Sequence, residues 1–183
     1  MFILALSDAS VIIPGTGSIY LAPAETVVPA NLVTPAAPWV NLGHTSLDDG
    51  LTITRDGGDS EVIGTWQNPS LRSRVDPTTF AITMVAHQVD NDVLGLYFGG
   101  GDATGTDMFG VTATTGTTDR AMYVRIVDGA NSVGLYLPKV SISSEDDIEV
   151  DPEGFLSFPL RATVLQVTGE DLMTWLAGNL GAA

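Results

Sequence analysis

Several residue types that support common protein chemistries are scarce in this chain of 183 residues. There is no cysteine, which excludes disulfides and thiolate catalysis, and with only two histidines a zinc site would need carboxylate ligands as well. Lys139 is the only lysine, and 7 bases stand against 22 acids. The resulting net charge of −15 repels nucleic acid, because phosphate binding requires Lys and Arg.

Long apolar runs are missing too. No segment reaches the roughly 18 consecutive apolar residues that a membrane helix needs, and the apolar start over residues 1–8 lacks the basic region of a signal peptide. The chain nevertheless has 44% hydrophobic and only 16% charged residues, which is typical of a folded protein and not of a disordered acidic tail. Its length fits one domain, or one domain with long arms.

Constellations of residues that could carry catalysis are weak. His44 and His87 are the only imidazoles, and no Gly-x-Ser-x-Gly elbow accompanies them, so structural roles are favoured. The acidic run over residues 145–151 could supply the paired carboxylates of a glycosidase, but without clustered aromatics a solvated edge is the better interpretation. The Gly- and Asp-rich loop over residues 99–107 has no known phosphate or calcium spacing, which leaves an ion there an open question. We expect no enzyme, no catalytic residue, no metal site and no cofactor.

Apolar alternation predicts a mainly β fold. The clearest strand covers residues 78–87, and the clearest hairpin pairs residues 121–127 with residues 133–137. A long run over residues 155–167 is another strand, in which Pro159 indicates an edge position or a bend. With turn signals between them, about seven or eight strands predict a β-sandwich or barrel.

Two further strands are expected on either side of residues 56–59, where Asp-Gly-Gly-Asp has the composition of a turn between paired strands. Leu51 and Ile53 alternate with threonines before it. In residues 71–75 the two arginines share one face and the remaining side chains share the other.

Helix is scarce and confined to short segments. Asp90 can cap a helix that ends at Gly99, and residues 170–177 could form a second one. Four prolines between residues 22 and 38 exclude a central strand or helix there, which leaves a semi-rigid extended arm or a flexible linker. We therefore divide the chain into an N-terminal arm with a first strand and the proline-rich segment, a β-sandwich with one flanking helix, and a C-terminal arm: residues 1–38, 39–168 and 169–183.

The order of these elements resembles that of a known family. Residues 39–53, with a Gly-His-Thr-Ser step, an Asp-Gly turn and a Leu-x-Ile strand, are similar to the opening segment of major tail tube proteins of long-tailed (siphovirus-type) bacteriophages, especially those of actinobacterial hosts. The resemblance covers roughly residues 18–167 and depends on the order of elements instead of one motif. The later matching segments are residues 59–67, 79–84, 89–100, 120–142 and 155–165.

The resemblance implies a structural virion protein whose hexameric rings stack into a hollow tail tube, through which DNA passes during ejection. The implied partners are further copies of the chain, a tape-measure protein, a tail terminator and baseplate or distal tail proteins, in a tail assembled in the host cytoplasm. It also implies that the terminal arms and a long loop between early strands carry the contacts between rings. A negatively charged lumen would let DNA pass without specific binding.

Two sets of residues follow as expectations. Aromatic, apolar and basic side chains in arms and loops are candidates for self-assembly, with packing inside the chain as the alternative for each tryptophan. This set is Trp39, Leu51, Ile53, Trp66, Arg72, Arg74 and Trp175. The acids expected to face the lumen are Asp48, Asp49, Asp56, Asp59 and Glu61.

Two other functions remain open. Tail terminator, minor tail and capsid decoration proteins are also acidic, free of cysteine and rich in β-structure. A secreted β-sandwich that binds carbohydrate would need an exposed aromatic platform and usually a signal peptide, and neither is evident in the sequence.

Overall fold

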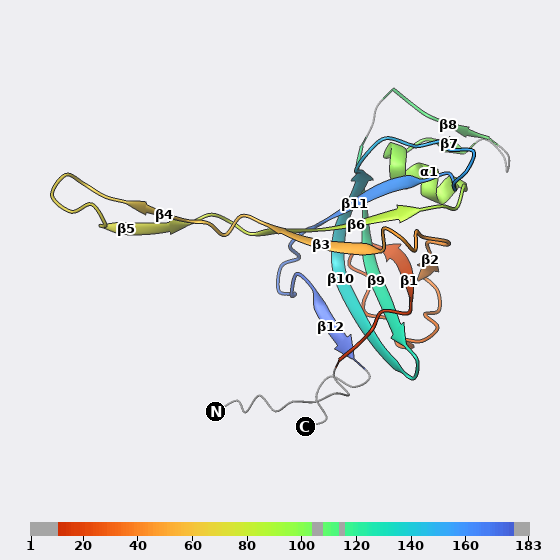
Figure 1. The fold of residues 1–183 in the computed structure, drawn as a ribbon, viewed down its shortest axis with the longest axis horizontal. Coiled ribbons are helices and arrows are strands. Elements are labelled where there is room, and N and C mark those ends of the chain that lie inside the picture. The colour runs from red at the N-terminus through yellow and green to blue at the C-terminus, as the bar shows by residue number, and fades with distance from the viewer. Residues whose placement is uncertain (1–10, 104–107, 114–115, 178–183) are drawn as a thin grey trace.

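The computed structural model describes residues 11–103, 108–113 and 116–177, and within these ranges the chain is mainly antiparallel β (Figure 1). An eight-stranded sheet has the order β2-β1-β9-β10-β11-β6-β3, and β12 also pairs with β10. Two small ladders, β4-β5 and β7-β8, complete the strands. The elements are β1 (Thr16–Pro23), β2 (Val40–Asn41), β3 (Leu51–Asp56), β4 (Ser60–Ile63), β5 (Arg72–Val75), β6 (Thr79–Ala86), α1 (Asn91–Phe98), β7 (Asp102–Ala103), β8 (Phe109–Gly110), β9 (Thr118–Asp128), β10 (Asn131–Ser144), β11 (Phe158–Val164) and β12 (Thr174–Ala177).

The large sheet curls into a barrel-like body because one short segment contacts strands from both ends of the strand order. Leu42 N donates to Ile19 O of β1 at 2.8 Å, and four residues later Ser46 N donates to Val85 O of β6 at 2.9 Å. The expectation of a β-sandwich or barrel with one short helix is therefore confirmed.

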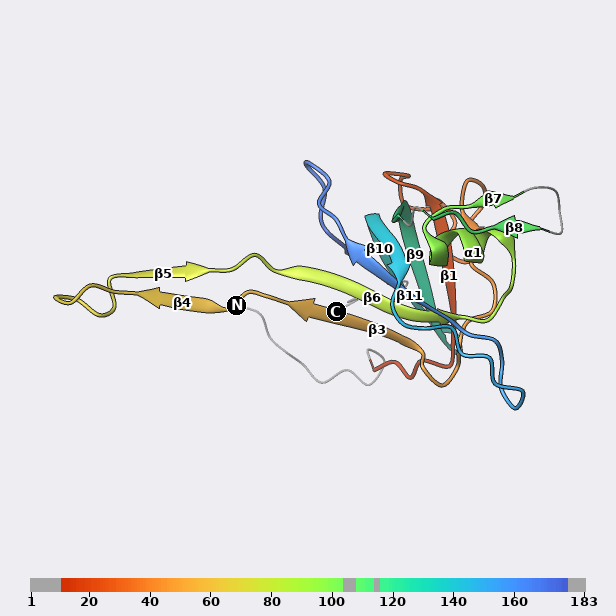
Figure 2. The ribbon, with the colours of Figure 1, turned by 90° about the horizontal axis from the view of Figure 1, so that it is seen from above.

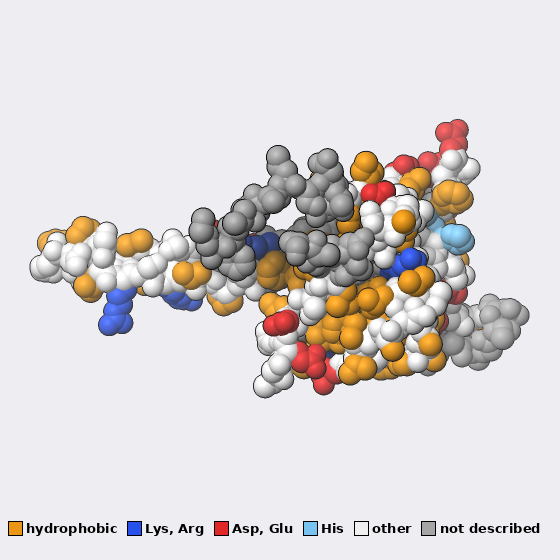
Figure 3. All heavy atoms as spheres, turned by 90° about the horizontal axis from the view of Figure 1, so that it is seen from below, with side chains coloured by type: hydrophobic (Ala, Val, Ile, Leu, Met, Phe, Trp, Pro, Cys, Tyr) orange, Lys and Arg blue, Asp and Glu red, His pale blue; other side chains and the backbone are white. Residues whose placement is uncertain are grey.

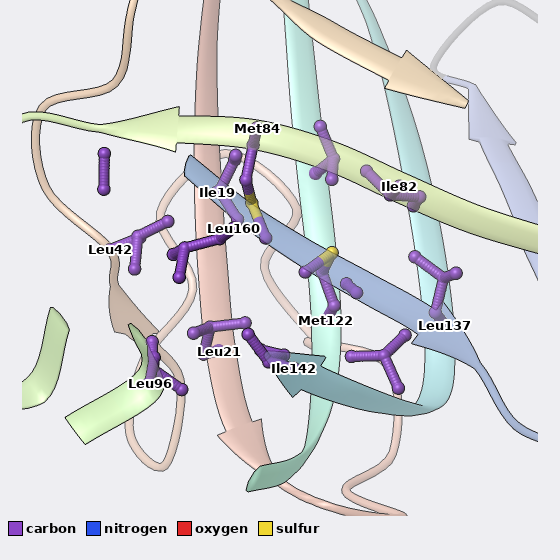
Figure 4. Close-up of a cluster of buried hydrophobic side chains, with 14 of the residues drawn as sticks. Ile19, Leu21, Leu42, Ile82, Met84, Leu96, Met122, Leu137, Ile142 and Leu160 are labelled. Carbon is purple, nitrogen blue, oxygen red and sulfur yellow. The ribbon is translucent and has the colours of Figure 1, made fainter. Parts of the chain in front are cut away.

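The inside of the curled sheet forms the hydrophobic core (Figure 4). Side chains from five strands and from α1 converge there, and Ile82, Leu137 and Leu160 have no exposed surface. Burying a side chain of this size stabilises the fold by about 1.5–3 kcal/mol. The side chains of this core together therefore stabilise the body as one folded unit.

A second cluster lies on the outside of β9 and β10, under the proline-rich segment. Trp39 packs edge-on against Tyr123 and Tyr136, with ring centroids 6.3 and 6.2 Å apart. The Tyr123 hydroxyl donates to Leu32 O at 2.9 Å, and the Tyr136 hydroxyl donates to Thr26 O at 2.8 Å. Residues 24–38, which we call the strap, are thus fastened to the body, while residues 16–23 before them are a strand inside the large sheet.

Two local predictions are confirmed in detail. Asp90 caps α1 by accepting a hydrogen bond from Val93 N at 2.8 Å, and Gly99 ends the helix with a left-handed φ of 71°. Strands β9 and β10 pair up to Asp128 and Asn131, which leaves a two-residue turn beginning at Gly129 with φ 56°.

Two other predictions are wrong. Residues 170–177 form no helix, because residues 174–177 pair as β12 with the part of β10 that β11 leaves free. Of the two alternatives for Pro159, an edge position or a bend, the edge position is wrong, since β11 lies between β10 and β6. Pro159 is tolerated there because it is opposite Glu145, just beyond the end of β10, and its carbonyl accepts from Glu145 N at 3.0 Å.

The described part of the chain contains no helix of the length and apolarity that would cross a membrane. It also contains no group of three or more His, Asp or Glu side chains able to hold a metal ion. Of the Gly- and Asp-rich loop over residues 99–107, residues 104–107 lie outside the described ranges.

Candidate assembly surface

A long hairpin projects from the body and is the most conspicuous feature of the molecule (Figures 1 and 2). Its base is the ladder between β3 and β6, from Leu51 opposite Met84 to Asp56 opposite Thr79. Pairing resumes further out between β4 and β5. We call residues 57–78 the distal arm.

The prediction that the chain turns back at residues 56–59 is wrong, because the chain continues outward there. Gly57 and Gly58 have φ values of 78° and 81°, so the strand kinks at this point without reversing. Asp76 N donates to Asp59 O at 3.0 Å, and the two strands therefore stay together across the kink.

The reversal lies at the tip of the distal arm. Thr65 N donates to Asn68 O at 2.7 Å, and Asn68 N donates back to Thr65 O at 3.1 Å. A Cβ on Gly64 would lie 2.2 Å from Pro69 O, so only glycine fits this close approach of the two strands. Trp66 at the tip is 101% exposed.

No side chain of the distal arm is buried, although many are apolar. The exposed fraction of its large apolar side chains ranges from 50% for Ile63 to 101% for Trp66. Exposed apolar residues that form a contiguous surface mark interaction sites, and a hairpin of two strands alone is marginally stable in water. The remaining members of this apolar set are Val62, Leu71 and Val75.

The two faces of the distal arm differ in chemistry. Opposite residues share a face, so Arg72 and Arg74 lie with Ile63 and Glu61, as the alternation in the sequence predicted. The other face carries Val62 and Val75 with two serines whose hydroxyls are 2.7 Å apart. Arg74 also lies 3.7 Å from an exposed carboxylate of Asp76, a contact that contributes little because water screens it.

The hairpin brings together part of the set expected for self-assembly. Trp66, Arg72 and Arg74 lie on the distal arm, and Ile53, 38% exposed, lies at its base. Leu51 is beside Ile53 but packs against the core. The arm also carries four apolar residues that were not predicted, although their apolar character in two segments able to pair was a usable signal: Val62, Ile63, Leu71 and Val75.

The other two tryptophans lie on the body. Trp39 is only 6% exposed and packs in the cluster under the strap, which corresponds to the alternative of packing inside the chain. Trp175 is 47% exposed on β12, opposite Leu135 of β10. These two side chains are separate from the distal arm.

The five acids expected to face a lumen are all exposed but follow the hairpin from base to arm. Asp48 and Asp49 precede β3, where the Ser46 hydroxyl donates to Asp49 Oδ2 at 2.6 Å. Asp56 and Asp59 flank the kink, and Glu61 is directly opposite Arg74. They therefore form a line along the hairpin and not one cluster.

A hollow of about 510 Å³ lies beside the start of β3, and five carboxylates line it together with residues of β3, β6 and β11, among them Thr52, Val85 and Pro159. Arg161 donates to Glu145 Oε1 at 3.0 Å and neutralises one of them. Burial, then the negative charge of Asp147 and Asp146, raises the pKa of the nearby Tyr97 hydroxyl. We call this hollow the acidic groove, and its carboxylates are Asp49, Glu145, Asp146, Asp147 and Glu149.

The two histidines are not part of a catalytic pair. His87 Nδ1 lies 3.2 Å from Leu156 O and 3.3 Å from the Ser157 hydroxyl, which itself donates to Phe155 O at 3.1 Å. Because the Ser157 hydroxyl donates to Phe155 O, its proton is directed away from the imidazole. His44 is exposed, and its carbonyl accepts from His87 N at 2.8 Å.

Comparisons with known proteins agree with this picture of a non-catalytic surface. A family described as "Phage tail tube protein" matches residues 4–183. "Major tail protein Gp23" of Mycobacterium phage D29 is 31% identical over 191 residues, which is 97% of this chain and 96% of that protein. The protein of the same name from Mycobacterium phage L5 is 30% identical over the same shares of both chains.

Proposed function

The chain belongs to the phage tail tube protein family, and from this membership we propose that it builds a hollow tail tube as stacked hexameric rings that conduct DNA during ejection. As a family member it is a structural component of the virion tail and not an enzyme. The relatives are major tail proteins of phages that infect mycobacteria, in agreement with the actinobacterial resemblance.

The observation that supports self-assembly is the distal arm. Between residues 59 and 77 every side chain is exposed, and five of them are large and apolar. In a free subunit this hairpin is unfavourable in free energy, because its residues lose conformational entropy when they become ordered but bury no apolar surface in return. A partner that covers the arm removes this cost, and in a tube the most abundant partner is another copy.

The shape of the molecule favours an open assembly over a closed pair. The arm extends along the long axis, away from the body (Figures 1 and 2). When the arm of one copy contacts a different surface on the next, the contact is head-to-tail, and such contacts generate rings or continuing stacks. Ile53, Trp66, Arg72 and Arg74 are the residues that we assign to this contact, with Leu51 supporting the arm from the core and Trp175 free for a separate contact on β12.

Acidic side chains would keep the lumen from holding DNA. Phosphate binding depends on Lys and Arg, and this chain has 7 of them against 22 acids. We propose that the exposed acids Asp48, Asp56 and Asp59 contribute to the negative lumen. Asp49 lines the acidic groove and Glu61 shares the face of Arg72 and Arg74, so we assign these two to the contact between copies instead.

Further partners follow from the architecture of a tail. A tube of defined length needs a tape-measure protein inside it, a terminator at one end and baseplate or distal tail proteins at the other. We propose these as the partners of the assembled rings.

Electron microscopy of the purified protein tests the proposed function. The sample is concentrated at about 0.15 M salt, where the Debye length of about 8 Å screens much of the repulsion between copies. Hollow tubes or six-fold rings are the expected result. Dispersed particles at every protein and salt concentration, and also after addition of tail initiator proteins, would contradict it.

A further inference from the structure

The outer part of the distal arm has the opposite charge balance to the rest of the chain. Residues 60–75 contain two arginines and a single acid, whereas the whole chain has a net charge of −15. Figure 3 shows basic side chains along one edge of the arm, while most acidic side chains visible in that view lie on the body. Arg72 has no carboxylate within ion-pair distance in the described part of the chain.

The acidic groove has the complementary character. Within the described ranges, no Lys or Arg lies within ion-pair distance of Asp146, Asp147 or Glu149. Residues of β3, β6 and β11 lie between these carboxylates, and of them Val85 and Pro159 are apolar and partly exposed, while Met84 and Leu160 are buried. A segment that carries arginines beside an apolar side chain therefore matches the charge of the groove.

The groove cannot receive the arm of its own chain. The tip of the arm is at one end of the long axis, and the loop between β10 and β11 that carries residues 145–149 is on the body, toward the other end, in both ribbon views (Figures 1 and 2). A second copy of the chain is the partner that supplies a matching arm in every assembly.

We propose that the distal arm of one copy docks in the acidic groove of the next copy, with Arg72 and Arg74 facing Asp146, Asp147 and Glu149. This contact rests on the proposed tube function and specifies its receiving surface. Ile63 shares a face with the two arginines and lies against Val85 and Pro159, which limits the access of water to the ion pairs and strengthens them.

A second hollow on the body is a poorer receiver. Its volume is about 390 Å³, and its lining includes Ile19, Leu51 and Val124 but no charged side chain. An arm docked there would bury Arg72 and Arg74 without counter-charges, which is unfavourable.

A charge-swap series tests the contact. The double variant R72E/R74E places two new acidic charges opposite the groove, and D147K/E149K replaces two of the five carboxylates of the groove with bases, so each variant alone is expected to remain folded but form no tubes. Combining all four substitutions restores the complementarity in every copy, and tubes are expected to return. The matched control combines R72E/R74E with E170K/D171K, two exposed acids in the turn before β12, and is expected to form no tubes.

The results separate this inference from the proposed function. If the wild type forms tubes and D147K/E149K forms them normally too, the groove is not the receiving surface. The proposed tube function would be unaffected by that result. If E170K/D171K restores tubes to R72E/R74E as well as D147K/E149K does, net charge alone explains the rescue. That result would also overturn the inference. Failure of the wild type itself to assemble would instead contradict the tube function.

Disulfide trapping gives a second readout that does not depend on charge reversal. Because the chain has no cysteine, R74C together with D147C introduces the only two thiols. When tubes of this double-cysteine variant are oxidised mildly, a ladder of cross-linked oligomers is expected on denaturing gels. A disulfide forms only when the two Cα atoms lie within about 7 Å. The control R74C with D171C is expected to stay monomeric on denaturing gels. Equal ladders from both pairs, or none from the first, would contradict the docking.

Discussion

The body and the distal arm are both antiparallel β-structure, but they use apolar residues in opposite ways. In the body, Ile82, Leu137 and Leu160 are completely buried within one curled sheet. In the arm, side chains of the same kind, such as Ile63 and Val75, are at least half exposed on a two-stranded ladder. The apolar residues of the body therefore stabilise the monomer, and those of the arm have no comparable role until another molecule covers them.

Under the proposed function, this contrast separates folding from assembly within one chain. The body has the buried surface that a domain of this size needs to fold. The arm has alternating strands and a tight turn at Gly64, which define its shape but not its stability. Substitutions in the two regions should consequently affect different measurements.

Removal of the distal arm should have the largest effect, and only on assembly. Asp56 and Thr79 are directly opposite, so Asn-Gly can replace residues 57–78 as a two-residue hairpin turn. The shortened chain should fold, with a melting temperature within a few degrees of the wild type, but form no tubes or rings in electron micrographs. Loss of folding would contradict the separation, and normal tubes would show that the arm is dispensable.

Leu137→Ala in the body should cause the largest loss of monomer stability. The side chain is fully buried, and truncation of such a leucine costs about 2–5 kcal/mol because a cavity remains. Val62→Ala on the arm, 57% exposed, is the matched substitution and should change the free energy of unfolding by less than about 0.5 kcal/mol. Urea unfolding of the unassembled chain measures both, and similar losses of stability in the two variants would contradict this difference between the body and the arm.

Trp66→Ala should weaken assembly while leaving the fold unchanged. Trp66 is fully exposed in the subunit, and an aromatic anchor that becomes buried at an interface is worth about 2 kcal/mol or more. The protein concentration at which tubes form, measured by light scattering, should therefore rise more than tenfold. Trp39→Phe, in the cluster under the strap, is the contrasting variant and should lower the melting temperature instead. An unchanged threshold for Trp66→Ala would exclude the tip as a contact.

Tyr136→Phe should cause a small and pH-dependent change in the stability of the body. It removes the hydroxyl that donates to Thr26 O of the strap, at a cost of about 1 kcal/mol. Burial raises the pKa of Tyr136, so the folded state holds this proton where the unfolded state loses it. The stabilisation is thus present below about pH 10 and is lost as the pH rises through the folded-state pKa.

Denaturation at pH 7 and above pH 10 measures this effect. The wild type should lose more stability than Tyr136→Phe across that interval. Tyr20→Phe, at a tyrosine whose ring contacts Tyr123, is the control and should retain the alkaline loss due to Tyr136. Identical alkaline losses in the wild type and Tyr136→Phe would contradict the role of this hydroxyl.

Features with local causes were predictable from the sequence. The capping of α1 by Asp90 and Gly99 depends on hydrogen bonds and a backbone angle within one turn. The same holds for the turn after Asp128 and for the alternation that puts Arg72 and Arg74 on one face. These local preferences are kept in the folded protein because no distant segment offers a competing interaction.

Features decided by distant segments were not predictable. Gly57 and Gly58 have the composition of a turn, but the pairing of residues 60–63 with residues 72–75 extends the hairpin past them. Likewise, residues 174–177 suit a helix or a strand, and the open edge of β10 selects the strand. The burial of Trp39 depends on the strap folding over it, which its own neighbours do not specify.

A reconstruction of the assembled tube by cryo-electron microscopy shows directly what covers the distal arm. We expect density for residues 57–78 packed against a neighbouring copy, with Trp66 no longer exposed. Arms that extend freely into solvent, in a tube held together by the bodies alone, would contradict it.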